Sequence, residues 1–114
     1  MGKFLINLRK TTKRYVVERR AAVYSEWRFN NKCRVLPAGK TLRIAVLAPA
    51  TVHWTHDGWQ TTRDVATRNT GLGVYVADLS TSDLDAGHSI VFTFFWPQVN
   101  RWEGADYSVT IQES

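Results

Sequence analysis

From Ser25 onward, apolar and polar residues alternate with a period of two, a pattern typical of strands that bury one face. The alternation is regular in several short runs separated by turn residues. It predicts that one set of side chains faces inward: Leu42, Ile44, Val46, Phe92, Phe94, Val109 and Ile111. The predicted fold class is therefore all-β, an antiparallel immunoglobulin-like β-sandwich over residues 25–114.

Turn residues divide this pattern into six or seven strands. Asp57-Gly58 is a tight-turn dipeptide between two alternating runs and predicts a hairpin. Residues 66–73 and 97–105 are expected to be loops. Residues 90–96 are apolar on both faces, which predicts a central strand covered from both sides.

Residues 1–24 differ from the rest and form a separate basic lead-in. Residues 1–43 contain 12 Lys or Arg and two Glu, whereas residues 44–114 contain three Arg and eight acids. The lead-in has a thin apolar stripe, so a short helix or an irregular segment is expected. A basic tail of this kind is either simply solvated or binds nucleic acid or an anionic surface.

The sequence also bears on the compartment of the protein. Cys33 is the single cysteine, so an intramolecular disulfide is excluded. No run of 18 apolar residues occurs, and the first ten residues lack the features of a signal peptide. We therefore expect a cytoplasmic protein without a membrane partner.

Motifs for catalysis or metal binding are weak. Glu103 and Asp106 lie three residues apart in a predicted loop, but a glycosidase needs two carboxylates facing each other across a cleft. His53 and His56 are expected on opposite faces of a strand, so they would not share a metal ion. No catalytic residue, metal or cofactor is predicted.

The aromatic content is the unusual feature, with five Trp, five Phe and four Tyr. Trp59 follows a predicted turn and Trp102 lies in a predicted loop, so periodicity does not bury either of them. Exposed indoles stack on sugar rings or on nucleic-acid bases. The acidic body favours sugars over a phosphate backbone. The alternative is that all five Trp pack internally or against a neighbouring domain.

Several segments in order resemble the C-terminal β-domain of bacterial glucoamylase-like proteins, the family-15 glycoside hydrolases. The resemblance covers roughly residues 25–112. It is carried by residues 27–30, 36–44, 52–54, 57–60, 70–73, 92–96 and 101–107, which include Trp27-Arg28-Phe29-Asn30, Asp57-Gly58-Trp59-Gln60 and Arg101-Trp102-Glu103-Gly104.

The resemblance implies a role in the metabolism of α-glucan. The chain is also similar to starch-binding β-sandwich modules, in which Trp side chains from turns and loops stack on glucose. By position, this implies carbohydrate binding by Trp59, Trp102 and His53. The family's catalytic glutamates lie on a helical barrel that is missing here.

The resemblance therefore implies a non-catalytic accessory domain or fragment of a glucan 1,4-alpha-glucosidase, structural or weakly α-glucan-binding. Its expected partners are a starch-like glucan or the catalytic barrel of a parent hydrolase, and nucleic acid is not favoured. The alternative function is a free-standing interaction module whose basic N-terminal segment binds nucleic acid or an anionic surface.

Overall fold

The structure, a computed structural model, describes residues 23–113. In this part of the chain, the segments in which apolar and polar residues alternate form β-strands. No helix occurs in this range. The strands are β1 (Tyr24–Trp27), β2 (Val35–Pro37), β3 (Thr41–Val46), β4 (Thr51–Thr55), β5 (Arg63–Ala66), β6 (Arg68–Asn69), β7 (Tyr75–Leu79), β8 (Ser89–Trp96), β9 (Arg101–Trp102) and β10 (Tyr107–Gln112).

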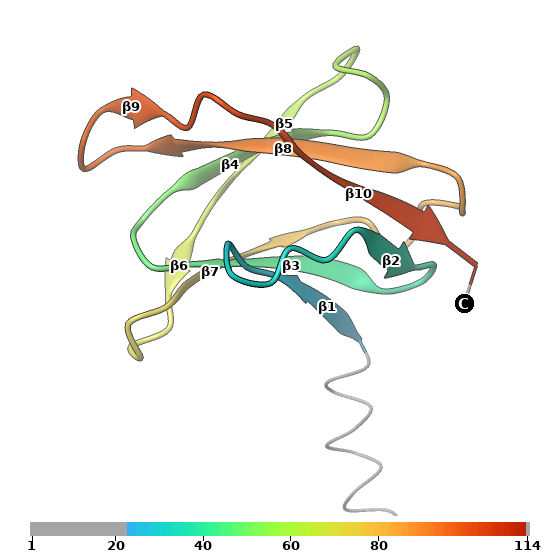
Figure 1. Cartoon of the computed structure of the whole chain (residues 1–114), viewed down its shortest axis with the longest axis horizontal. Coiled ribbons are helices and arrows are strands. Elements are labelled where there is room, and N and C mark those ends of the chain that lie inside the picture. Colours follow the sequence, from blue (N-terminus) through green and yellow to red (C-terminus); the bar gives the residue numbers. More distant parts are fainter. Residues whose placement is uncertain (1–22, 114) are drawn as a thin grey trace, which may run out of the picture.

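The strands form two sheets that face each other (Figure 1). One sheet has four strands in the order β1-β3-β7-β6. The other has six strands, in the order β2-β10-β8-β4-β5, with β9 paired to β8 beside this path. The predicted all-β sandwich is therefore confirmed.

The core lies between the two sheets and consists of the residues that alternation predicts. All seven predicted inward side chains are at most 2% exposed. Trp27 and Trp54 are each 1% exposed and fill the space between the sheets. Complete burial of a large apolar side chain contributes about 1.5–3 kcal/mol, so this set is the main source of stability.

The sheets are mixed, whereas the sequence analysis expected antiparallel pairing throughout. β1 pairs with β3 in parallel, and β2 pairs with β10 in parallel. All other strand pairs are antiparallel. The reason is the path of the chain, which runs from β1 to β2 in the opposite sheet before it returns as β3.

Two predicted loops contain short strands. β6 lies within residues 66–73, and β9 lies within residues 97–105. The hairpin after β4 has a longer connection than the two-residue turn that Asp57-Gly58 predicts, because β5 begins only at Arg63. β8 lies between β10 and β4, so it is an inner strand as expected. Within the described range, no helix has the length and apolar character that a membrane span requires.

Candidate functional site

The turn after β4 is organised by one buried hydroxyl group. Thr55 is 1% exposed, and its Oγ1 accepts the backbone N–H of Trp59 at 3.1 Å. The same hydroxyl lies 2.7 Å from Asp57 Oδ1 and 2.6 Å from the carbonyl oxygen of Thr61, so it donates to one of these two acceptors. The hydroxyl thus ties the beginning, middle and end of the turn together.

The carboxylate of Asp57 closes the same turn from its other side. Thr61 donates its backbone N–H to Oδ1 at 2.9 Å and its hydroxyl to Oδ2 at 2.6 Å. These two hydrogen bonds from Thr61 are the main reason that the pKa of Asp57 is held well below its usual range. Asp57 is therefore charged at neutral pH, and its negative charge stabilises the turn.

Trp59 has an uncommon backbone conformation for an aromatic residue. Its φ is 70°, in the left-handed region, directly after Gly58 at 71°. Such a conformation costs a non-glycine residue about 1–3 kcal/mol, so it persists only where surrounding interactions enforce it. The hydrogen bond from Trp59 N to Thr55 Oγ1 is one such interaction. The result is an indole that remains 37% exposed above the sheet.

The imidazole of His53 lies beneath this indole. His53 is on β4 between the buried Val52 and Trp54, so its side chain points to the outer face of the six-stranded sheet. The rings of His53 and Trp59 are stacked, with centroids 5.4 Å apart and planes 18° apart. Asp64 Oδ1 lies 2.5 Å from His53 Nδ1 and accepts its hydrogen bond.

Trp102 reaches the same imidazole from a third segment. β9 pairs with the end of β8, which places Trp102 opposite Phe95. The indole contacts His53 edge to face, with centroids 5.8 Å apart and planes 73° apart, and contacts Phe95 at 5.2 Å. Trp102 is 54% exposed. In Figure 1, β9 lies beside the end of β8 and the β4–β5 turn lies at the top of the view, both away from the four-stranded sheet.

Glu103 anchors the loop that carries Trp102. Its backbone N–H donates to the carbonyl of Phe94 at 2.8 Å. Its two carboxylate oxygens accept Trp96 Nε1 at 2.9 Å and Tyr107 Oη at 2.6 Å. Burial, together with the hydrogen bond to Glu103, raises the pKa of Tyr107 to about 12. The carboxylate of Glu103 thus fastens the end of β9 to β8 and β10.

The structure brings together all three residues that the sequence analysis named as candidates for carbohydrate binding. We call the surface formed by His53, Trp59, Trp102 and Phe95 the stacking platform. His53 comes from β4, Trp59 from the following turn and Trp102 from β9. Trp59 stacks on His53 and is still 37% exposed, and Trp102 stands at a steep angle to both rings.

Other candidate groups do not converge. His56 lies beside Trp54 and His88, with ring centroids 6.2 Å from each, and is not part of the contacts around His53. Within residues 23–113, no three His, Cys, Asp or Glu side chains form a group that could hold a metal ion. Cys33 lies in a loop, and burial raises the pKa of its thiol.

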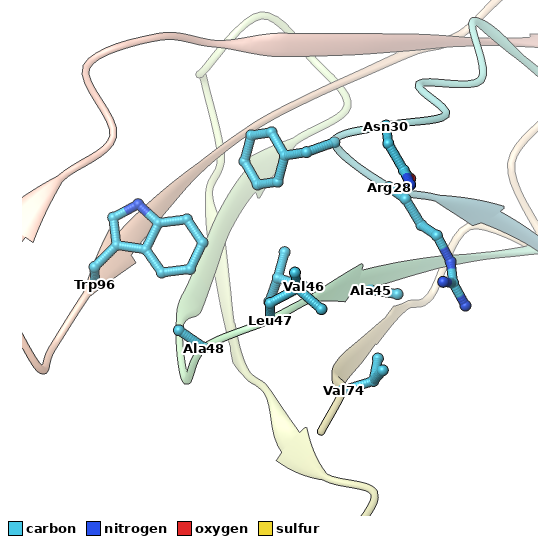
Figure 2. A pocket seen from close by; sticks show the side chains of 9 residues that line it. Arg28, Asn30, Ala45, Val46, Leu47, Ala48, Val74 and Trp96 are labelled. Carbon is cyan, nitrogen blue, oxygen red and sulfur yellow. The ribbon is translucent and has the colours of Figure 1, made fainter. Parts of the chain in front are cut away.

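A hollow of about 350 Å³ opens between the ends of the two sheets. Trp96, at the end of β8, faces Val46, Leu47 and Ala48 at and after the end of β3 (Figure 2). The other lining residues are Arg28, Phe29, Asn30, Ala45 and Val74. Among these described residues there is no acidic side chain, so the hollow lacks the pair of carboxylates that glycoside cleavage requires.

Sequence reasoning missed Asp64, Phe95 and Thr55 as parts of this region. Phe95 could be found from the sequence, because in the apolar run 90–96 it alternates with the inward-facing Phe94 and so lies on the outer face. Asp64 depends on the register of the hairpin, in which it pairs with His53. The basic segment proposed for nucleic-acid binding falls mainly on residues 1–22, which lie outside the described residues.

Comparison of the chain with protein-family models, with curated proteins and with solved structures found no match.

Proposed function

We propose that this β-sandwich is a non-catalytic module that binds α-glucan on the stacking platform, as an accessory domain of a glucoamylase-like hydrolase. The observation that carries the proposal is the convergence of His53, Trp59 and Trp102 from separate segments onto one outer face, with both indoles exposed. A pyranose ring has an apolar face of C–H groups, and an aromatic ring offers a flat surface of matching size.

The relative orientation of the rings supports a bent ligand. Trp59 is nearly parallel to His53, whereas Trp102 is close to perpendicular to it, so the two indole planes are far from coplanar. A flat β-linked chain would present its sugar faces to coplanar rings. An α-1,4-linked glucan curves from one residue to the next, so consecutive glucose units can meet two inclined planes.

The charge of the described body supports an uncharged ligand. Residues 23–113 contain nine acids and eight Lys or Arg. Nucleic-acid binding takes much of its affinity from cationic contacts to phosphate, and this nearly balanced body offers no such excess. A neutral polysaccharide needs no net positive surface.

The expected affinity is low. By analogy with aromatic pairs, each stacking contact contributes about 0.5–1.5 kcal/mol. Two such contacts with a few hydrogen bonds give about 4 kcal/mol, which corresponds to a dissociation constant near 1 mM. Such a module would act by keeping a tethered enzyme near an insoluble or polymeric substrate, where many weak contacts add up.

Native electrophoresis in gels containing soluble starch tests the proposal. Wild-type protein should migrate more slowly as the starch concentration rises, and Trp59→Ala and Trp102→Ala should each reduce this retardation severalfold. Leu72→Ala is the matched control, because Leu72 is 86% exposed on the β6–β7 loop, away from the platform. Equal retardation of the wild type and both Trp variants would contradict the proposal.

The non-catalytic part of the proposal has its own test. Glu103 is committed to hydrogen bonds with Trp96 and Tyr107, which is a structural arrangement rather than that of a general acid facing a cleft. Purified protein should release no glucose from maltooligosaccharides. Glucose release that disappears in Glu103→Gln would show that the chain is an enzyme.

A further inference from the structure

The stacking platform has a polar residue at its edge. Asp64 lies on β5 directly opposite His53 on β4, and its Oδ1 is 2.5 Å from His53 Nδ1. A carboxylate can only accept, so Nδ1 is the donor in this pair. The contact fixes the imidazole plane on which Trp59 stacks.

The second carboxylate oxygen of Asp64 remains available. The Asp64 side chain is 62% exposed. Its Oδ2 makes no hydrogen bond or ion pair with the part of the protein that the structure describes, residues 23–113. The platform therefore has an anionic hydrogen-bond acceptor beside its aromatic rings and open to solvent.

Neighbouring cations do not neutralise this acceptor. Arg63 precedes Asp64 on β5, and its guanidinium lies over the ring of Trp54, 5.5 Å from the ring centroid. Within residues 23–113, no Lys or Arg forms a salt bridge with Asp64. Asp57, in the turn that connects β4 to β5, adds a second negative charge to the same hairpin.

We propose that Asp64 is the polar recognition residue of the stacking platform. Its free oxygen selects uncharged sugars by accepting a hydrogen bond from one of their hydroxyl groups. This inference rests on the proposed function. A hydrogen bond from a hydroxyl to a carboxylate is charge-assisted and stronger than one between neutral groups. The same carboxylate repels a sugar that carries a carboxylate, sulfate or phosphate, so one residue provides both affinity and discrimination.

The stacking rings alone would not discriminate in this way. The faces of His53, Trp59 and Trp102 contact C–H groups, which neutral and anionic glucans share. Selection for the uncharged ligand must then come from a charged group at the edge of the rings. Asp64 is the acid in direct contact with His53, the ring that contacts both indoles.

Two substitutions separate a recognition role from a purely positioning role. Asp64→Asn keeps an oxygen that can accept the hydrogen bond of His53 Nδ1, so the imidazole stays in place, but it removes the negative charge. Asp64→Ala removes both. If Asp64 only positions His53, the Asn variant should bind neutral glucan as the wild type does, and the Ala variant should not.

The experiment uses the full chain in affinity gels containing either soluble amylose or carboxymethyl-amylose of the same length. Wild-type protein should be retarded by amylose and several times less by the carboxymethylated polymer. Asp64→Asn should weaken binding to amylose about three- to tenfold and should bind the two polymers almost equally. Unchanged near-ultraviolet circular dichroism would show that the aromatic rings keep their arrangement in this variant.

Two results would overturn the inference, and they can be told apart. If the wild type is retarded by amylose and Asp64→Asn matches the wild type in its retardation by each polymer, Asp64 is not the recognition residue and the proposed function still stands. If the wild type is retarded by neither polymer, the proposed function and this inference fail together.

Discussion

Replacing Thr55 by valine tests how the turn holds Trp59. Valine keeps the β-branched shape of threonine and replaces the hydroxyl with a methyl group. That hydroxyl accepts the N–H of Trp59 at 3.1 Å and the N–H of Asp57 at 3.3 Å, and it donates within 2.7 Å to Asp57 or Thr61. A single substitution therefore removes every hydrogen bond that links β4 to its turn through this side chain.

The expected loss of stability follows from these contacts. A typical hydrogen bond contributes about 0.5–1.5 kcal/mol net, and a buried group left without a partner costs about 1–3 kcal/mol. Thr55 is 1% exposed, so water does not readily replace its hydroxyl. The longer 3.3 Å bond contributes little, and the added methyl group offsets part of the loss. We expect the free energy of unfolding to fall by about 2 kcal/mol in Thr55→Val.

Urea unfolding followed by tryptophan fluorescence measures this change. The midpoint should decrease while the slope of the free energy with urea stays constant, because the surface exposed on unfolding is nearly the same. Thr62→Val is the matched control, since Thr62 is exposed in the same connection, and it should change stability by less than about 0.5 kcal/mol. Thr55→Val should also bind starch more weakly, because Trp59 is then free to leave its left-handed conformation.

A decrease in stability no larger than that of Thr62→Val would refute this reasoning. It would mean that the turn keeps its shape without the hydroxyl. Full starch binding by a destabilised Thr55→Val would refute the second step, the link between the turn and the orientation of Trp59.

Three further predictions concern ionisable groups near the platform. Glu103→Gln leaves one of its two partners, Trp96 or Tyr107, without an acceptor, and should lower the free energy of unfolding by about 1–3 kcal/mol in urea titrations. Tyr107 has a raised pKa of about 12, so its contribution to stability is complete below pH 10 and is lost as the pH rises from 10 to 12. An absorbance titration should show one tyrosine ionising near pH 12, and a full tyrosine signal by pH 11 would contradict this. Asp57 has a lowered pKa because of hydrogen bonds from Thr61, so its contribution to stability is complete above about pH 4 and is lost as the pH falls below that value. Asp57→Asn should therefore reduce the loss of stability at acid pH in a plot of the free energy of unfolding against pH. An unchanged loss at acid pH would contradict this.

The sandwich could be predicted because its signal is local. Leu42, Ile44 and Val46 alternate with their neighbours on one strand, and burial follows directly from that parity. The parallel pairing of β1 with β3 could not be predicted in this way. It depends on which sheet β2 joins between them, and nothing in the short runs of residues determines that choice.

The platform could be predicted only in part. Trp59 and Trp102 were identified because they lie in a predicted turn and a predicted loop, where strand alternation does not predict burial. Both are exposed in the structure. Their contact with His53 joins segments far apart in the sequence, and the sequence analysis placed His53 with them only through a family resemblance.

The contact between Asp64 and His53 was missed because the predicted two-residue turn implies a different hairpin register. A two-residue turn at Asp57-Gly58 would pair His53 with Thr62, whereas the structure pairs His53 with Asp64. The extra length comes from the hydrogen bonds that close the turn around the carboxylate of Asp57. Such side-chain contacts within a turn change the register of both strands, and dipeptide preferences do not account for them.

The central claim is that α-glucan binds on the exposed indoles, and the five indole N–H signals in a nuclear magnetic resonance titration with maltoheptaose test it most directly. The signals of Trp59 and Trp102 should shift progressively with a dissociation constant near 1 mM, while those of the buried Trp27 and Trp54 stay in place. Trp96, which donates its N–H to Glu103 and lines the hollow between the sheets, should also stay in place. No shift at Trp59 and Trp102, or a shift centred on Trp96, would contradict the account.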